Sequence, residues 1–329
     1  MNMFENQTIL ITGGTGSFAR ECILQLQKKC RPKKVIVFSR DEFKQWRMKK
    51  ENPLLSMPNM RYFLGDIRDK ERLAFALEDV DIVIHTAALK QVDTAEYNPS
   101  EYIKTNILGS QNLIECAINK GVKKVIALST DKAVNPINLY GASKLCADKL
   151  FIAGASYGGK QTPLFYIVRY GNVLGSRGSL LQRWQEEGEK VPVTDERMTR
   201  FWISIENAAE FVLESFKLPL KGGEILIPKS PSMKIIEFAK ALDKKITITG
   251  IRPGEKLHEV LISEEMAHQT LEFDNYYMVL PQIFQGQEVL KERIGSYGGE
   301  LVKSDFCYKS DTNTSWLDFT DLQKMLQSS

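Results

Sequence analysis

The sequence predicts an α/β protein built on a doubly wound parallel sheet with a smaller C-terminal lobe. In the first half, short runs rich in Val, Ile, Leu and Phe alternate with amphipathic stretches, which is the pattern of parallel strands covered by helices on both faces. A glycine-rich turn follows the first run, and beyond about Asn172 the apolar runs shorten while Gly and Pro become frequent. Such a sheet binds its ligands beyond the carboxyl ends of its strands.

The individual elements follow from these patterns. A strand is predicted where a short apolar run precedes polar or small residues, and a helix where apolar residues recur every three to four positions. The predicted strands are Thr8–Ile11, Val35–Phe38, Arg61–Leu64, Asp81–Ile84, Val125–Leu128 and Phe165–Val168. The predicted helices are Glu71–Leu77, Asn106–Asn119 and Arg200–Phe216.

The length of the chain predicts two parts, because 329 residues exceed what a single hydrophobic core usually supports. We expect residues 1–171 to form the sheet domain, and residues 199–220 to return to it through the predicted helix. Residues 172–198 and 221–329 are then expected to form the smaller lobe.

Composition excludes several classes of function. The basic and acidic residues number 44 and 41, a balance too even to indicate nucleic acid or a membrane surface as a partner. No run approaches the roughly 18 apolar residues of a membrane span, and no signal peptide is visible, which favours the cytoplasm. The five cysteines form no C-x-x-C pair, so we expect reduced thiols and no metal site.

The glycine-rich turn predicts a dinucleotide site of Rossmann type. Its spacing is G-x-x-G-x-x-A, with Ala19 at the third position, and it lies between the first strand and a probable helix start. Glycine lets backbone N–H groups approach a pyrophosphate, whose charge the helix N-terminus favours. The alternative is a purely structural turn. The expected cofactor contacts here are Gly13, Thr15, Gly16, Ser17 and Phe18.

The end of the second strand favours NADP over NAD. Ser39 is followed by Arg40, Asp41 and, one turn later, Lys44, and a hydroxyl followed by Arg can hold a 2′-phosphate through charge-assisted hydrogen bonds. The alternative is that these are solvated surface charges paired with one another. Asp66 and Ile67, after the third strand, are expected near the adenine, although a turn would use the same aspartate.

A Tyr/Lys pair after the fifth strand predicts redox chemistry. Tyr140 and Lys144 are four residues apart, hence on one face of a helix, where the ammonium can stabilise a phenolate. That would make a tyrosine with a reference pKa of about 10 a usable base near neutrality. A surface helix would explain Y-x-x-x-K alone, but Thr130 at the preceding strand end favours a catalytic site.

These motifs together resemble the extended short-chain dehydrogenase/reductase superfamily over the whole chain. Within it, TDK at 130–132, AVNPINLYGASK, HTAALK, RYGNVLGSRGS, MTRFW and IRPGEKLHE are similar to the inverting UDP-N-acetylglucosamine 4,6-dehydratases that open pseudaminic acid biosynthesis. The resemblance implies a tightly bound NADP recycled within each turnover, a UDP-sugar substrate and a homo-oligomer. Retaining relatives typically carry Met where Tyr140 stands and are longer, with membrane segments.

The resemblance also implies roles in catalysis. Tyr140 would remove the proton of the sugar's C4 hydroxyl as C4 is oxidised, which makes the C5 proton acidic. Lys132, if burial and another cation lower its pKa, would abstract that proton, and Asp131, if protonated, would protonate the departing C6 hydroxyl. Reduction at C6 completes the cycle. The alternative for Asp131 and Lys132 is a strand-end salt bridge.

Further contacts are implied by the same resemblance. Ala87, Lys90 and Val173 would join the cofactor site, and Lys90, Thr105 and Asn172 would contact the substrate. Arg252 and Glu255 would hold the nucleotide, although a structural salt bridge would use the same pair. His85 is expected to be a packing residue. A uridine pocket would comprise Leu180, Leu181, Gln182, Arg183, Trp184, Thr194 and Met198.

Two other functions stay open on the sequence alone. A nucleotide-sugar epimerase, ketoreductase or retaining dehydratase of the same superfamily would share most of these motifs. A cofactor-sensing protein without catalysis would share the glycine-rich turn, but such proteins tend to lose the Tyr or the Lys, and both are present here.

Overall fold

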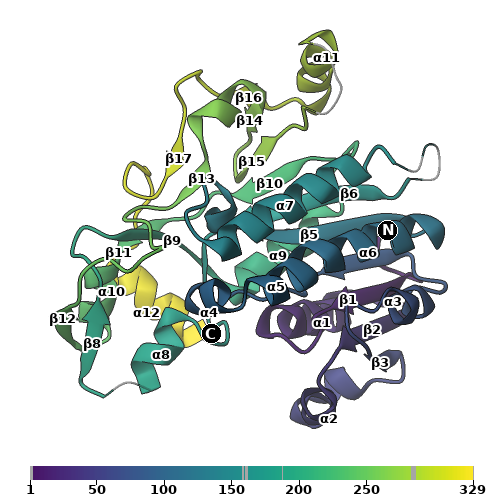
Figure 1. Ribbon diagram of the computed structural model, residues 1–329, viewed down its shortest axis with the longest axis horizontal. Helices are drawn as coiled ribbons and strands as arrows, with labels where there is room; N and C mark the ends of the chain where they lie inside the picture. The colour runs from purple at the N-terminus through teal and green to yellow at the C-terminus, as the bar shows by residue number, and fades with distance from the viewer. Residues whose placement is uncertain (1–2, 158, 160–161, 187, 283–286, 329) are drawn as a thin grey trace.

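The computed structural model describes residues 3–157, 159, 162–186, 188–282 and 287–328. Its centre is a ten-stranded sheet in the order β16-β14-β15-β10-β6-β5-β4-β1-β2-β3, which runs from β16 near the top of Figure 1 to β3 at the lower right. The strands from β10 to β3 pair in parallel. All of the predicted strands are confirmed, as β1 Thr8–Thr12, β2 Lys34–Ser39, β3 Met60–Leu64, β4 Ile82–His85, β5 Lys124–Thr130 and β6 Leu164–Tyr170.

Helices cover both faces of this sheet because its strands are apolar on both sides. Along β1, Ile9 and Ile11 face one core and Leu10 faces the other. The first core is closed by α1 Ser17–Lys29, α2 Glu42–Glu51 and α9 Ile205–Ser215. The second is closed by α3 Lys70–Ala76, α6 Gly109–Asn119 and α7 Leu139–Gly154.

The prediction of one helix over Arg200–Phe216 is wrong in its first part. Residues Thr199–Ser204 form β9, and the helix α9 begins only at Ile205. The side chain of Ser204 accepts a hydrogen bond from the Asn207 N–H, 3.1 Å away, and so caps the helix. Every residue of β9 is buried, and its aromatic and β-branched side chains favour a strand with two covered faces.

The segment 221–329, predicted for the smaller lobe, is shared between the two parts. β10 Ile225–Pro228 adds to β6 in parallel, and three antiparallel strands extend the sheet from there. Parallel pairing with β6 fits because β10 is apolar along its whole length. The antiparallel strands are β14 Thr270–Glu272, β15 Tyr276–Val279 and β16 Glu300–Leu301.

The smaller lobe has a core of its own in which large aromatic side chains stack. Trp202 of β9 lies with its ring centroid 4.6 Å from that of Phe238, and Trp184 packs on the same ring. This lobe consists of β7 Asn172–Leu174, α8 Leu180–Glu186, β8 Lys190–Val193, β11 Ser232–Lys234, α10 Ile235–Ala241, β12 Lys245–Ile248 and α12 Phe319–Ser328, together with β9.

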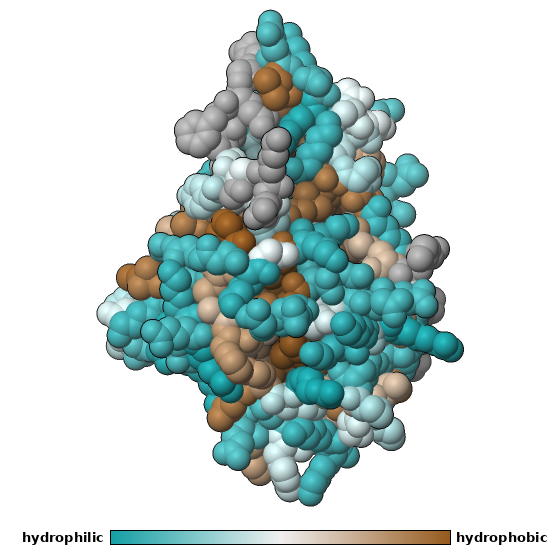
Figure 2. Space-filling view, turned by 90° about the vertical axis from the view of Figure 1, so that its right-hand side faces the viewer, coloured by the Kyte–Doolittle hydropathy of each residue, from teal (hydrophilic) through white to brown (hydrophobic). Residues whose placement is uncertain are grey.

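The remaining helices and strands complete the chain. They are η1 Pro53–Ser56, α4 Val92–Tyr97, α5 Pro99–Tyr102, the π-helix η2 Ile103–Leu108, η3 Asp131–Ala133, β13 Val260–Ile262, η5 Glu264–Gln269, α11 Gln287–Tyr297 and β17 Tyr308–Lys309. Hydrophilic residues dominate the face in Figure 2, with apolar residues in small groups between them. Within the described ranges, no helix is both long and apolar enough to span a membrane.

A buried ion pair ties the sheet domain to the chain that follows it. Arg169 of β6 lies 3.1 Å from Asp148 of α7, and both side chains are almost fully buried. Asp148 also accepts a hydrogen bond from Ser129 at 2.6 Å, while Arg169 donates to the carbonyl of Leu261 in β13 at 3.1 Å. Strand, helix and C-terminal segment are therefore joined at one point behind the carboxyl end of β5.

We expect Asp148→Asn to lower the free energy of unfolding by about 3–5 kcal/mol, because it leaves the Arg169 charge buried without a counter-ion. The measurement is urea unfolding at neutral pH. Glu214→Gln is the control, since it breaks an exposed ion pair with Lys217 and should cost less than about 1 kcal/mol. Equal costs in the two variants would contradict this account of the pair.

Candidate active site

A cavity of about 590 Å³ opens at the carboxyl ends of β1, β2, β4, β5 and β6. It is lined by the glycine-rich turn, by the ends of the strands, and by the start of α7, as the fold class predicts. Every residue predicted to contact the cofactor lines it: Gly13, Thr15, Gly16, Ser17, Phe18, Ser39, Arg40, Asp41, Lys44, Asp66, Ile67, Ala87, Lys90, Tyr140, Lys144 and Val173.

The glycine-rich turn leaves room for an anion at the start of α1. Gly13 has φ +63°, and a Cβ there would lie 2.8 Å from the Ala87 backbone, so only glycine fits. Gly16 is the N-cap of α1 and offers no side chain to the first N–H groups, and the first turn carries no acidic residue. These N–H groups and the helix dipole suit a diphosphate.

At the other end of the cavity, the residues predicted to contact the 2′-phosphate differ in how strongly they are already paired with other side chains. Asp41 caps α2 by accepting from the Lys44 N–H at 2.9 Å, and its carboxylate also pairs with the Lys44 ammonium at 3.1 Å. Arg40 is half-exposed, and its pairing with Asp66 is long, at 3.5 Å. Asp66 is held mainly by Arg68, at 2.7 Å. Arg40 is therefore the cation best placed to meet an added phosphate.

The reactive segment is assembled where β5 ends. Thr130 is the last residue of the strand, and its hydroxyl donates to Asp131 Oδ1 at 2.8 Å. The Lys132 ammonium donates to the same oxygen at 3.0 Å. Asp131 is fully buried, and its Oδ2 has no hydrogen-bond partner among the described residues. Tyr140 lies at the start of α7 and completes the group.

α7 can approach this turn because of a glycine. A Cβ on Gly141 would lie 2.1 Å from the Lys132 carbonyl oxygen, closer than any two such atoms can come. The Gly141 N–H also donates to Asn138 Oδ1 at 2.7 Å, which caps the helix. Gly141 of the YGASK motif thus allows Tyr140 to lie close to Lys132.

The tyrosine is less acidic here than the sequence predicts. Burial raises the pKa of Tyr140 to about 12, although Lys132 and a hydrogen bond with Thr130 act in the opposite direction. Lys144 donates to the Leu128 carbonyl at 2.7 Å, and burial lowers its own pKa. The cation that favours the phenolate in this structure is therefore Lys132, and the role of Lys144 in making the tyrosine a base stays a prediction.

Lys132 also differs from its prediction. Burial lowers its pKa, but the carboxylates of Asp131 and Glu259 outweigh that effect and raise the pKa above its ordinary value. A cation does crowd it, since Arg200 acts to lower the pKa, but the two anions are stronger. The condition under which the sequence makes Lys132 the C5 base, a lowered pKa, is not met in this structure, because Asp131 and Glu259 together outweigh burial and Arg200.

His85 is the packing residue that the sequence predicts. It is buried at the end of β4, where its Nδ1 is hydrogen-bonded to the Thr12 hydroxyl at 2.7 Å and its Nε2 lies 3.3 Å from the Ser110 hydroxyl. Burial, with a contribution from Lys144, lowers the pKa of His85 to about 3. The imidazole is neutral at working pH and supports the floor of the cavity.

The buried side-chain amide of Asn106 fixes the loop after β4. Asn106, on η2, accepts from the Leu89 N–H at 2.8 Å and donates to the Leu89 carbonyl at 2.9 Å. Lys90 then reaches across the cavity mouth and donates to the Arg177 carbonyl at 2.9 Å. Thr105, on the same π-helix, lines the cavity with a hydroxyl that has no partner among the described residues. π-helical turns are frequent at functional sites.

The predicted substrate contacts of the smaller lobe are not gathered around the cavity. Arg252 and Glu255 form a pair at 4.0 Å near the site, because the Gly254 carbonyl accepts from Asn138, the cap of α7, at 2.8 Å. The side chains of Leu181, Trp184 and Met198 are buried in the lobe core. The roles of Asn172, Leu180, Leu181, Gln182, Arg183, Trp184, Thr194, Met198, Arg252 and Glu255 stay predictions, and none of them lines the cavity.

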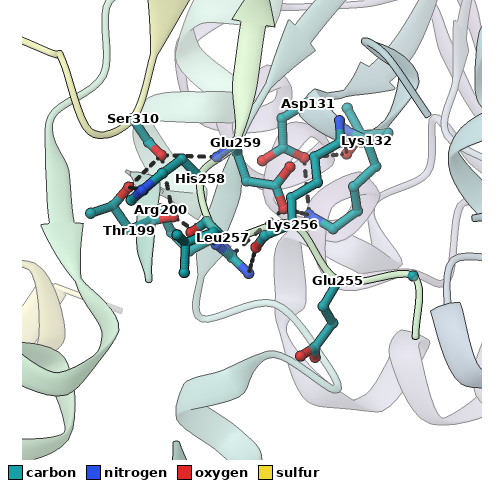
Figure 3. A network of polar contacts seen from close by, with 12 residues as sticks. Asp131, Lys132, Thr199, Arg200, Glu255, Lys256, Leu257, His258, Glu259 and Ser310 are labelled. Atoms are coloured by element: carbon teal, nitrogen blue, oxygen red, sulfur yellow. Dashed lines mark hydrogen bonds and ion pairs between the residues drawn. The ribbon is translucent and has the colours of Figure 1, made fainter. Parts of the chain in front are cut away.

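Sequence reasoning missed several residues that the fold brings to the site. Arg177 lines the cavity, and its N–H donates to the Ser17 hydroxyl at 3.0 Å. Lys256 donates to the carbonyl of Val134, just after Lys132. Arg200 and Glu259 lie beyond it (Figure 3). The segments LGSRGS and IRPGEK are rich in Gly or Pro, which predicts loops, but nothing in the sequence showed which side chains would point inward. The described part of the chain contains no group of side chains suited to a metal ion.

Comparison with known proteins agrees with this geometry. A family described as "Polysaccharide biosynthesis protein" matches residues 9–281. A Campylobacter jejuni protein named UDP-N-acetylglucosamine 4,6-dehydratase (inverting) is 50% identical, covering 98% of each chain. A Rickettsia akari protein named UDP-glucose 4-epimerase is 40% identical, covering 98% of this chain and 96% of its own. The crystal structure of Pen from Bacillus thuringiensis superposes with a TM-score of 0.87 at 33% identity, covering 99% and 98% of the two chains.

We expect acid to destabilise the protein through His85. Its folded pKa of about 3 lies below the ordinary 6.5, so as pH falls through 6.5 the unfolded chain takes up the proton first. Stability is therefore complete above that pH and decreases toward pH 3. Between about pH 7.5 and pH 4.5 the loss from this group should be about 2–3 kcal/mol. Urea unfolding of His85→Gln should lack this part of the loss, whereas the exposed control His268→Gln should retain it; identical pH dependence in both variants would refute the assignment.

Proposed function

The chain belongs to the polysaccharide biosynthesis protein family, and from this membership and its site we propose that it is an inverting UDP-N-acetylglucosamine 4,6-dehydratase. The observation that carries the proposal is the joining of Asp131, Lys132 and Tyr140 at the end of β5. A redox step at a carbinol carbon needs only a Tyr/Lys pair. Loss of water also needs a base that acts at one carbon and an acid that acts at the hydroxyl of the neighbouring carbon.

The cavity fits a nicotinamide dinucleotide, and we propose NADP. The glycine-rich turn and the uncapped start of α1 suit its diphosphate, and the half-exposed Arg40 suits a 2′-phosphate. Such a cofactor supplies reversible hydride acceptance, and because the net reaction consumes no oxidant, we expect it to stay tightly bound. Relatives of the same fold that are less than 25% identical include a dTDP-glucose 4,6-dehydratase solved with NAD, so the choice between the two cofactors rests on Arg40.

The residues of this chain divide the proton transfers between them. Tyr140 takes the proton of the C4 hydroxyl, assisted by the Lys132 ammonium and the Thr130 hydroxyl, which favour its ionised form. The C4 ketone acidifies the C5 proton. Lys132 removes that proton once it has passed its own proton to Asp131. Asp131, 3.0 Å from the Lys132 nitrogen, protonates the departing C6 hydroxyl. C6 of the resulting enone would regain the hydride that C4 gave up, and delivery of a proton to the opposite face of C5 would then invert that centre.

The finer parts of the proposal follow from the family resemblance. As a lyase, the protein would form UDP-2-acetamido-2,6-dideoxy-β-L-arabino-hex-4-ulose for pseudaminic acid biosynthesis, acting in the cytoplasm as a homo-oligomer. Lys90 and Thr105 would contact the sugar, and Arg252 with Glu255 the nucleotide. The alternative is a nucleotide-sugar 4-epimerase, which the 40% identical Rickettsia akari relative favours. An epimerase needs no acid beside its base, so Asp131 and Lys132 weigh against it.

We expect UDP-N-acetylglucosamine, incubated with the enzyme and no added reductant, to give a product lighter by one water in mass spectrometry. In deuterated water, proton NMR should show deuterium at C5 and the inverted configuration. Lys132→Ala should abolish water loss and C5 exchange while cofactor binding persists, because Ala cannot accept the C5 proton. The control Lys149→Ala changes an exposed lysine of α7 and should retain activity. A C4 epimer of unchanged mass would instead establish the alternative.

We expect Arg40→Ala to weaken NADP binding about 10- to 100-fold while NAD binding changes little, because only the 2′-phosphate loses a charge-assisted contact. Titration of both cofactors by calorimetry measures this. The control is Arg47→Ala, an exposed arginine of α2 paired with Glu51. Equal losses for NADP and NAD would contradict the proposed choice of cofactor.

A further inference from the structure

Glu259 is a buried carboxylate that reaches the reactive segment from the C-terminal part of the chain. It is 2% exposed and precedes β13. Its Oε1 lies 3.4 Å from the Lys132 nitrogen and 3.6 Å from Arg200 Nε. Its Oε2 is buried without a hydrogen-bond partner among the described residues. Figure 3 shows Glu259 pointing toward Asp131 and Lys132.

The backbone of Glu259 is fixed, so this position is built rather than incidental. Its N–H donates to the Ser310 hydroxyl at 2.9 Å, and the Ser310 N–H donates back to its carbonyl at 2.9 Å. Arg200 is held equally firmly, because its guanidinium donates to the carbonyls of Thr199 at 2.7 Å and Lys256 at 3.0 Å. Burying a carboxylate carries a desolvation cost, and here the frame that holds it is already formed.

The charges around the Lys132 nitrogen come from several elements. Asp131 of η3 and Glu259 before β13 are the anions, and Arg200 of β9 and Lys256 are the cations that oppose them. Tyr140 of α7 is the neutral titratable neighbour. Glu259 favours the ammonium form of Lys132, and Arg200 weakens that preference.

Elimination needs the proton that Lys132 and Asp131 share to lie on Asp131 and not on Lys132. Moving the proton from Lys132 to Asp131 along their 3.0 Å hydrogen bond converts an ammonium and a carboxylate into a free amine and a carboxylic acid. No proton is gained or lost in this exchange. The amine can then take the C5 proton and the acid can protonate the C6 hydroxyl. A third charge at 3.4 Å decides how readily the exchange occurs.

We propose that Glu259 is a positioning residue for elimination: it holds the Lys132 ammonium beside Asp131 and, balanced by Arg200, sets how readily that ammonium gives up its proton. The inference rests on the proposed function, since it assigns Glu259 to the dehydration step. It also explains why a segment far along the chain closes over η3, with Lys256 bonded to the Val134 carbonyl.

The test is the pH dependence of C5 exchange and water loss, measured on the intact protein with its cofactor. Wild type should gain activity as pH rises, until the Asp131–Lys132 pair holds only the single proton that the exchange needs. Glu259→Gln keeps the shape of the side chain but removes its charge, so we expect its rising limb about 1–3 pH units lower. Glu264→Gln changes an exposed carboxylate nearby and should keep the wild-type profile.

A second variant should move the profile the other way. Arg200→Gln removes the cation that opposes Glu259, so we expect its rising limb at higher pH than in wild type. Opposite displacements support the inference, because a merely structural role would lower the rate without moving the limb in two directions. Thermal unfolding and cofactor binding verify that each variant is folded, and if Glu259→Gln is not, the direction of the Arg200→Gln displacement decides alone.

The outcomes separate this inference from the proposed function. If wild type loses no water from UDP-N-acetylglucosamine, the function itself is wrong. If wild type loses water but the variants keep its pH profile, or move it in the same direction, the role of Glu259 is overturned and the dehydratase assignment stands.

Discussion

The site depends on the burial of the Asp131 carboxylate at the end of β5. A fully buried anion is costly unless hydrogen bonds and counter-charges compensate it. Thr130 and Lys132 supply the nearest compensation, both on one carboxylate oxygen. The other oxygen is buried and has no hydrogen-bond partner among the described residues, so the compensation of this anion is incomplete in this structure.

This requirement extends into the helix that follows. α7 must begin close to the Asp131–Ala133 turn if Tyr140 is to lie beside Lys132, and only Gly141 permits that approach. The cap residue Asn138 holds the start of α7 and, at the same time, the Gly254 carbonyl of the smaller lobe. One asparagine thus couples the position of the tyrosine to the position of the loop that carries Arg252 and Glu255.

The electrostatics show why neighbouring charges matter more here than any single reference pKa. Burial alone would lower the pKa of Lys132 and raise that of Tyr140, yet the charges around each group oppose these effects. The lysine is held as an ammonium by two carboxylates, and that ammonium in turn favours the tyrosinate. Protons therefore move within a coupled group, and separate assignments of acid and base describe only stages of the cycle.

The sequence by itself determined the six strands β1 to β6, the glycine-rich turn and the cavity residues near the ends of these strands, because these depend on local periodicity and on short motifs at the strand ends. It also placed Thr130, Asp131, Lys132 and Tyr140 together, since they lie within eleven positions of one another. Only the tertiary structure decided the strand β9 and the role of the segment after residue 221, where burial on two faces overrode local pattern. It alone brought Glu259 and Arg200 to Lys132, because a contact across 127 positions leaves no mark in local spacing, and there Glu259 joins the adjacent Asp131 in raising the pKa of the lysine.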